Sequence, residues 1–73
     1  MSHPDITLDV RGLPPPEPLE HCLEALADLL PGQRLCMLID REPYPLYPML
    51  DRDGFQHECT FEETYFQVTI WID

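Results

Sequence analysis

Three cysteines are the most reactive side chains in this 73-residue chain: Cys22, Cys36 and Cys59. An odd number at wide spacings is neither a disulfide framework nor a Cys-x-x-Cys pair, so we expect reduced thiols. Cys22 and Cys59 fall at apolar positions of their segments, which predicts packing in the core. Cys36 is predicted to lie on an uncovered sheet face. A thiol there could carry sulfur or be oxidised if a nearby cation or helix N-terminus stabilised its thiolate.

Two proline-rich segments that each carry an arginine form a second candidate site. The residues concerned are Arg11, Gly12 and Glu17 in the first segment, and Asp40, Arg41, Glu42 and Tyr44 in the second. Two guanidinium groups would attract a small anion or a carboxylate of a partner protein. Alternatively, the arginines pair with Asp9, Asp40 or Glu42 and only brace the turns. The prolines also remove backbone N–H groups that an anion would need.

Histidine and cysteine side chains are too few and too scattered to predict a metal site. His57 and Cys59 share one face of a predicted strand, and His21 adjoins Cys22. Zinc requires three or four converging ligands, and this spacing matches no established ligand pattern. We therefore predict neither a metal nor a cofactor.

The charge balance narrows the choice of partners. Fourteen acidic residues face four arginines and no lysine, for a formal net charge of −10. Such a surface repels nucleic acid and anionic membranes, so we expect neither as a partner. The first residues lack the features of a secretory signal peptide, and no apolar run approaches the ~20 residues of a membrane span. These features predict a cytoplasmic protein.

The elements that must position these residues follow from periodicity. Alternation predicts strands over residues 6–10, 55–61 and 65–72, and a short apolar run predicts a central strand over 35–39. Helical spacing of Leu19, Leu23, Leu26 and Leu30, with Cys22 and Leu29 beside them, predicts a helix of about four turns from Pro16 to Pro31. Leu46, Met49 and Leu50 predict a short second helix that ends at Gly54, with Pro48 inside its first turn or at a kink.

This order predicts an α+β fold: a β-α-β-α-β-β two-layer sandwich, with two helices on one face of a four-stranded mixed sheet. Residues 1–5 are predicted to form a flexible tail, and residues 6–73 a single domain. The first two strands are parallel in this fold, so both proline-rich segments lie at one sheet edge, where ligands of open α/β sheets bind. The uncovered face is expected to carry Leu38, Tyr65 and Trp71, a candidate surface for protein contacts.

One motif carries a resemblance to a known family. The pattern Asp9-x-Arg11-Gly12-Leu13-x-x-Pro16-x-Pro18, followed by Pro31-Gly32 and Asp40, resembles the TusA (SirA-like) sulfur-carrier family over nearly the whole chain. In that family the motif is Cys-Pro-x-Pro, and its cysteine carries a persulfide between sulfur-relay proteins. Pro15 occupies the cysteine position here. A proline cannot form a thiolate, so the resemblance implies the fold without the reaction.

The second proline-rich segment is similar to an uncharacterised branch of the same superfamily. That branch shares a Pro-Pro-x-Pro junction and an acid-Pro-x-Pro-Leu motif, here Glu42-Pro43-Tyr44-Pro45-Leu46. Its members often read Asp-His-Asp-Pro before that motif, and they occur alone or beside haemerythrin-like domains. The present chain reads Asp40-Arg41-Glu42-Pro43 instead.

These observations favour a non-catalytic module that binds a protein partner, in a sulfur, redox or respiratory context that the resemblance implies. We expect a monomer or a weak homodimer. Rigid prolines suit docking, because they reduce the entropy lost on binding. Two alternatives stay open: a sulfur carrier that uses Cys36, and a sensor of a small anion or metabolite at the proline-rich edge.

Overall fold

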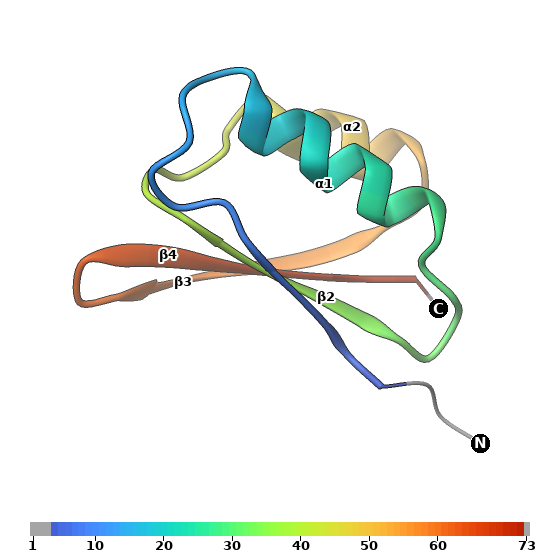
Figure 1. Ribbon diagram of the computed structural model, residues 1–73. Helices are drawn as coiled ribbons and strands as arrows, with labels where there is room; N and C mark the ends of the chain where they lie inside the picture. The colour runs from blue at the N-terminus through green and yellow to red at the C-terminus, as the bar shows by residue number, and fades with distance from the viewer. Residues whose placement is uncertain (1–3, 73) are drawn as a thin grey trace.

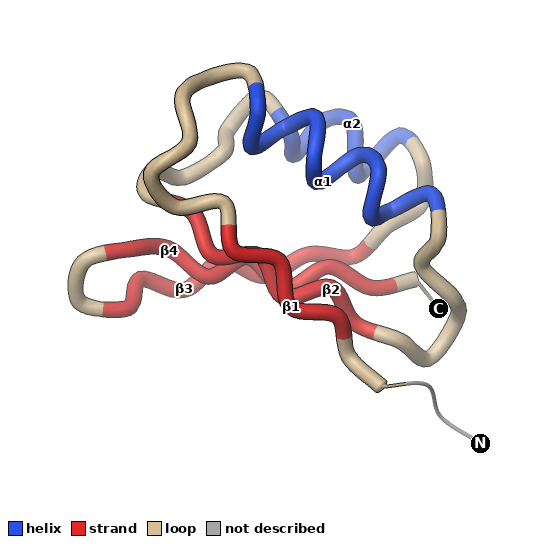
Figure 2. Tube along the Cα trace, in the orientation of Figure 1, coloured by secondary structure: helices blue, strands red, loops and turns tan. Residues whose placement is uncertain are grey.

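The computed structural model describes residues 4–72 and confirms the predicted architecture. Along the chain run β1 (Ile6–Asp9), α1 (Glu17–Ala27), β2 (Arg34–Ile39), α2 (Leu46–Arg52), β3 (Gln56–Glu62) and β4 (Tyr65–Trp71). The strands form one sheet in the order β1-β2-β4-β3. Both helices lie over the same face of this sheet, and the other face is left without a covering layer of helices (Figures 1 and 2). Neither helix in residues 4–72 is long and apolar enough to cross a membrane.

β2 is the central strand that its apolar sequence predicts. It pairs in parallel with β1, where Leu8 lies opposite Met37, and antiparallel with β4, where Met37 lies opposite Val68. Leu35, Met37 and Ile39 are buried under the helices, whereas Cys36 and Leu38 alternate onto the other face and are half-buried. The period of two therefore predicts correctly which side chains of β2 enter the core.

α1 is shorter than predicted and turns a different stripe to the sheet. The helix ends at Ala27, and the N–H groups of Asp28 and Leu29 bond to the carbonyls of Ala25 and Leu26 in a tightened last turn. Pro31 explains the early end, because it has no N–H for the carbonyl four residues before it, that of Ala27, and its ring would clash with that carbonyl. The predicted extension to Leu30 is wrong.

The buried side chains of α1 are Cys22 and Leu26, with Leu19 half-buried beside them. Leu23 and Leu30, predicted as core, are 38% and 44% exposed. This leucine-rich stretch offers two overlapping helical stripes, and the position of the sheet selects the one centred on Cys22.

α2 contains a proline without a kink. Pro48 is the third residue of the helix, inside the first turn, where the backbone N–H has no helical partner in any case. Leu46 and Leu50 are buried and anchor the helix on the sheet. The chain then turns through Gly54 at φ +83°, and the N–H of Phe55 bonds to the Leu50 carbonyl. The predicted second helix is confirmed.

β3 and β4 form the predicted hairpin, with one disagreement. Phe61 is expected on the covered face, yet it is 62% exposed, and its ring packs on Phe66 with centroids 5.0 Å apart. The reason is the length of the hairpin, whose tip extends beyond the two helices, so nothing from the second layer reaches its end (Figure 1).

The predicted N-terminal tail is only partly described, since residues 1–3 lie outside the described residues. The Pro4 carbonyl accepts a hydrogen bond from Nε2 of Gln33 at 3.0 Å. The Asp5 carboxylate accepts one from the backbone N–H of Arg34 at 3.3 Å. These two bonds hold Pro4 and Asp5 to the start of β2.

Candidate functional site

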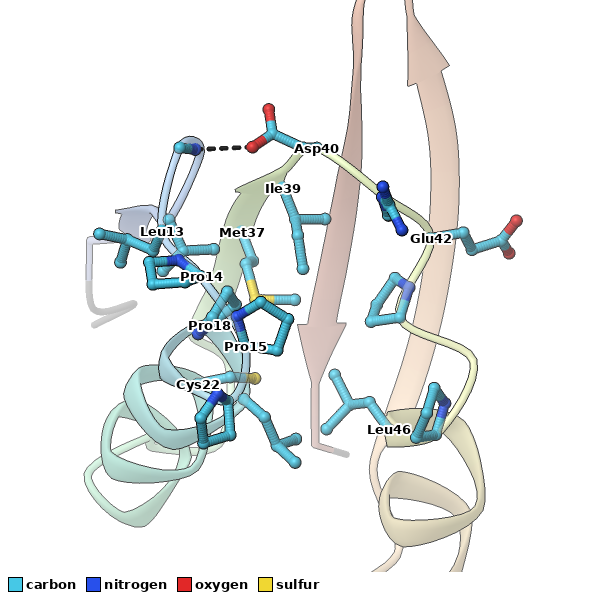
Figure 3. A pocket seen from close by; sticks show the side chains of 17 residues that line it. Leu13, Pro14, Pro15, Pro18, Cys22, Met37, Ile39, Asp40, Glu42 and Leu46 are labelled. Carbon is cyan, nitrogen blue, oxygen red and sulfur yellow. Dashed lines mark hydrogen bonds between the residues drawn. The ribbon is translucent and has the colours of Figure 1, made fainter.

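A cleft of about 640 Å³ opens between the two strand-to-helix connections (Figure 3). We call residues 10–17, between β1 and α1, the first junction, and residues 40–46, between β2 and α2, the second junction. The two junctions form opposite walls of the cleft, at the carboxyl ends of the parallel strands. Six of its seventeen lining residues are prolines: Pro14, Pro15, Pro16, Pro18, Pro43 and Pro45.

The floor of the cleft is apolar and comes from three elements. α1 contributes Cys22, β2 contributes Met37 and Ile39, and α2 contributes Leu46. All four side chains are buried in the core, so the floor is the top layer of the hydrophobic core itself. Pro14, Pro15 and Leu13 stand above it on the first wall and are exposed (Figure 3).

One hydrogen bond joins the two walls. The backbone N–H of Gly12 donates to Oδ2 of Asp40 at 2.6 Å (Figure 3). Gly12 has φ +81°, a left-handed conformation that glycine adopts without the steric cost of a Cβ. The Arg-Gly turn therefore presents its N–H to the second junction, and Asp40 holds the two junctions together at one end of the cleft.

Arg11 is engaged within its own turn. Its Nε and its terminal nitrogen donate to the two Asp9 carboxylate oxygens at 2.9 and 2.8 Å, and its Cζ lies 4.7 Å from the centre of the Tyr65 ring. The side-chain bonds from Arg11, followed by its backbone N–H, lower the pKa of Asp9 to about 2. The same ion pair raises the pKa of Arg11. This guanidinium braces the turn, which is the alternative the sequence left open.

Arg41 differs from Arg11. It is exposed at the cleft, and no ion pair joins it to another side chain in residues 4–72. The opposite wall offers an anion few free backbone N–H groups. Pro16 and Pro18 carry no N–H, and the N–H of Glu17 is already bonded to the Pro14 carbonyl at 3.0 Å. The edge therefore combines one available cation with few backbone donors.

Glu42 and Tyr44 belong to a side-chain cluster around Tyr47, which the sequence did not single out. The Tyr47 hydroxyl donates to Oε2 of Glu42 at 2.9 Å. Its ring stacks on His57 with centroids 4.7 Å apart, and Tyr44 packs against its edge at 6.2 Å. Burial, with hydrogen bonds to Cys59 and Glu42, raises the pKa of Tyr47 far above its ordinary value. In the sequence, the only sign of this cluster is the spacing of Tyr44 and Tyr47, and that spacing does not predict the bond from Tyr47 to Glu42.

The cluster continues from Tyr47 to the surface. Nε2 of His57 lies 3.1 Å from Oδ1 of Asp51, so α2 and β3 are joined by a polar contact as well as by stacking. In the described part of the chain, no three His, Cys, Asp or Glu side chains converge as metal ligands. The cluster's evident effect is structural, because it fastens the second junction to α2 and β3.

The three thiols lie in different environments. Cys22 is fully buried beneath the cleft, and burial raises its pKa to about 11. It is therefore protonated near neutral pH and a poor nucleophile. Cys36 lies on the opposite face of the sheet, half-buried between Thr7 and Thr69 in the neighbouring strands. Cys59 is half-buried on β3. Only Cys22 borders the cleft.

The residues of the predicted contact surface do not gather into one patch. Tyr65 and Trp71 stand at opposite ends of β4. Each ring is covered by an arginine, Arg11 over Tyr65 at 4.7 Å and Arg34 over Trp71 at 5.5 Å. Leu38 lies between Asp9 and Gln67 in the strand register. Of the predicted junction residues, Gly12, Asp40, Arg41 and Glu42 line the cleft, whereas Arg11, Glu17 and Tyr44 do not. The sheet-face residues lie apart from one another.

Comparisons with known proteins agree with the fold. Residues 7–72 match a protein family described as an uncharacterized conserved protein, DUF2249. A crystal structure of a SirA-like protein from Desulfitobacterium hafniense superposes with a TM-score of 0.75 at 29% sequence identity, covering 89% of this chain and 93% of that chain. No curated protein sequence matches the chain.

Proposed function

The chain belongs to the DUF2249 family, within the TusA/SirA-like superfamily, and we propose that it is a non-catalytic module that binds a protein partner through the cleft. The resemblance to sulfur carriers supports a sulfur, redox or respiratory context for that partner. One observation carries the proposal. At the cysteine position of the family motif stands Pro15, an exposed apolar ring on the wall of an apolar cleft.

The surroundings of Pro15 favour docking over chemistry. The thiol nearest to the cleft, Cys22, is buried and protonated, so it offers no thiolate. Arg11 is already paired with Asp9, and the prolines leave few N–H groups for a small anion. What the cleft does offer is a rigid apolar surface of ligand size. Prolines also limit the loss of backbone freedom on binding, which favours affinity.

Site-specific photo-crosslinking in the native host tests this proposal. A benzophenone amino acid replaces Leu13, which is 36% exposed on the cleft wall. The matched control places the same group at Leu23, which is 38% exposed on α1 and does not line the cleft. We expect a discrete cross-linked protein from position 13 and not from position 23. The same products from both positions, or none from position 13, would contradict the proposal.

A sulfur-transfer assay tests the non-catalytic part. The protein is incubated with a cysteine desulfurase and cysteine, and intact mass is measured without reductant. We expect no stable gain of a sulfur atom. Cys36 is the alternative thiol that the sequence favours, and it is half-buried on the sheet face, as Cys59 is on β3. An adduct that disappears in Cys36→Ser would overturn the proposal and make the protein a sulfur carrier.

A further inference from the structure

Charge in the cleft is confined to three consecutive residues of the second junction, Asp40, Arg41 and Glu42. The other lining residues are a glycine, a cysteine, prolines and apolar side chains. An occupant of the cleft therefore meets an apolar surface that carries its charged groups on one wall.

Both carboxylates on that wall are engaged in holding the walls in place. Oδ2 of Asp40 accepts the Gly12 N–H at 2.6 Å, and Oε2 of Glu42 accepts the Tyr47 hydroxyl at 2.9 Å. The Glu42 carboxylate is also directed away from the centre of the cleft (Figure 3). Arg41 is exposed, and among the residues that the structure describes it forms neither an ion pair nor a side-chain hydrogen bond. Arg41 is therefore the lining charge that is left for an occupant.

A guanidinium beside an apolar cleft suits a carboxylate that is attached to apolar groups. Arginine presents several N–H donors in a plane, a geometry that matches the two oxygens of a carboxylate. A small anion alone would leave the apolar surface uncovered. The cleft of about 640 Å³ falls within the range of pockets that bury whole ligands, roughly 300–1,000 Å³. The occupant therefore has to supply several apolar side chains, with the carboxylate fixing their orientation.

We propose that the cleft binds a segment of a partner protein that carries two or more apolar side chains beside one aspartate or glutamate. The apolar side chains lie over Met37 and Leu46, and the carboxylate pairs with Arg41. This inference rests on the proposed function and specifies the chemistry of the partner. Because Arg41 is exposed, its ion pair selects the partner and its orientation more than it adds affinity.

This chain itself carries a segment of that composition, at the tip of the β3–β4 hairpin. Phe61 is 62% exposed, and Glu62 and Glu63 follow it. Each copy, however, has a net charge of −10, and two copies in contact repel each other within the Debye length of ~8 Å at physiological salt. A different protein can present the same kind of segment on a neutral or basic surface. We therefore assign the cleft to a different protein.

Backbone amide NMR with three synthetic peptides of equal length tests the inference. One peptide combines glutamate with leucine, the second combines glutamine with leucine, and the third combines glutamate with serine. We expect the glutamate–leucine peptide to shift the amides of Leu13, Ile39 and Leu46, with little effect at Thr60 and Thr69 on the open sheet face. The glutamate–serine peptide should leave the cleft amides nearly unshifted, because it offers nothing to the apolar floor.

Two variants of equal net charge isolate the role of Arg41. Arg41→Gln removes the guanidinium at the cleft, and Arg52→Gln removes one from the last turn of α2, outside the cleft. Both side chains are exposed, so both variants should fold. The preference for the glutamate–leucine over the glutamine–leucine peptide should be roughly 3- to 5-fold greater in Arg52→Gln than in Arg41→Gln, as for an exposed ion pair. The equal net charge cancels the general repulsion between an acidic protein and an acidic peptide.

Several outcomes would overturn the inference. The same preference in both variants would remove Arg41 from recognition, and equal shifts from the glutamate–serine peptide would remove the apolar floor. No shift of the cleft amides by any peptide, up to millimolar concentrations, would contradict both parts. A dimer in sedimentation that dissociates in Phe61→Ala would assign the cleft to a second copy.

The crosslinking experiment separates this inference from the proposed function. If position 13 captures a partner segment without an acidic residue, the inference fails while the proposed function stands. If position 13 yields no cross-link, the proposed function itself fails. Capture of a segment with apolar side chains beside an aspartate or glutamate supports both.

Discussion

The two junctions occupy equivalent places, each following a parallel strand and leading into a helix, yet they are held in different ways. The first is braced within itself by the Asp9–Arg11 ion pair and by its run of prolines. The second is braced from outside, through the bond of Glu42 to Tyr47 and the buried side chain of Leu46. One wall of the cleft is thus held mainly by proline rings and an ion pair close to it in the chain, and the other by contacts with α2.

This difference explains how the first junction can lose the family's cysteine and keep its form. The bonds that shape it involve Asp9, Arg11, Gly12 and Asp40, and none of them uses the side chain at position 15. A proline there removes the nucleophile and leaves those bonds intact. The second junction has no such independence, because its position follows α2. Substitutions should therefore cost more stability in the second wall than in the first.

The largest difference is expected for Leu46→Ala against Leu13→Ala. Leu46 is 1% exposed, so truncation leaves a cavity between α2 and the sheet and should lower the free energy of unfolding by about 3 kcal/mol. Leu13 is 36% exposed on the first wall and should cost less than about 1 kcal/mol. Urea denaturation followed by Trp71 fluorescence measures both. Equal losses would show that the two walls are supported alike.

Tyr47→Phe should have the next largest effect. The variant keeps the ring stacked on His57 but removes the hydroxyl 2.9 Å from the half-buried Glu42 carboxylate. The loss should be about 1.5 kcal/mol, because a partly buried acceptor loses its better-buried donor. Tyr44→Phe also removes a hydroxyl that interacts with Glu42, but from a ring that is 68% exposed, so it serves as the comparison and should lose less. A larger effect for Tyr44→Phe would contradict the assignment of Tyr47 as the support of the second junction.

Asp40→Ala should have a smaller effect on stability, since its bond to Gly12 is exposed. We expect a loss of about 1 kcal/mol in urea denaturation. Asp40→Asn should restore most of that stability, because the amide oxygen still accepts from the Gly12 N–H. Amide NMR of Gly12 gives a second measurement, and its resonance should move more in Asp40→Ala than in Asp40→Asn. Identical stabilities of the two variants would show that this bond does not join the walls.

The smallest effect concerns the exposed Asp9–Arg11 pair, and it appears as a pH dependence. The pKa of Asp9 falls from 3.8 to about 2 on folding, so the folded state favours the ionised carboxylate. The pair's contribution to stability is therefore complete above about pH 4 and is lost as the pH falls through about 2. The difference in unfolding free energy between wild type and Asp9→Asn should shrink across this range. Arg11→Gln should behave in the same way, and a difference independent of pH would contradict the assignment.

Sequence periodicity predicted the elements and most of the faces, because alternation and helical spacing are local properties of the chain. Periodicity predicted burial wrongly where the sequence fits two alternative buried faces equally well. Leu23 and Leu30 fit one helical stripe as well as Cys22 fits the other, and the sheet selected the second. Phe61 continues the alternation of β3 correctly but lies beyond the reach of the helices. Burial of a side chain depends on which element packs against its face, and the periodicity of the sequence carries no information on that element.

The candidate site, too, could be predicted from the sequence in its location but not in its side-chain contacts. Its two junctions could be placed at one sheet edge from the parallel pairing of the first two strands. The partner of each charged side chain could not be known. From the sequence, Arg11 could form an ion pair with either Asp9 or Asp40. In the structure Arg11 pairs with Asp9, and Asp40 accepts a hydrogen bond from the Gly12 N–H instead. Tyr47 supports the second junction through its hydrogen bond to Glu42, and no sequence motif predicts that bond.

By itself, then, the sequence determined the order of strands and helices, the rigid proline-rich junctions, the acidic surface and the absence of a cysteine at position 15. These are properties of residue type and of spacing along the chain. The tertiary structure alone decided that the prolines face one another across an apolar cleft, with Cys22 beneath it and Asp40 joining its walls. The physical reason is that packing and hydrogen bonding select among partners distant in the chain, and that selection is made only when the helices settle on the sheet.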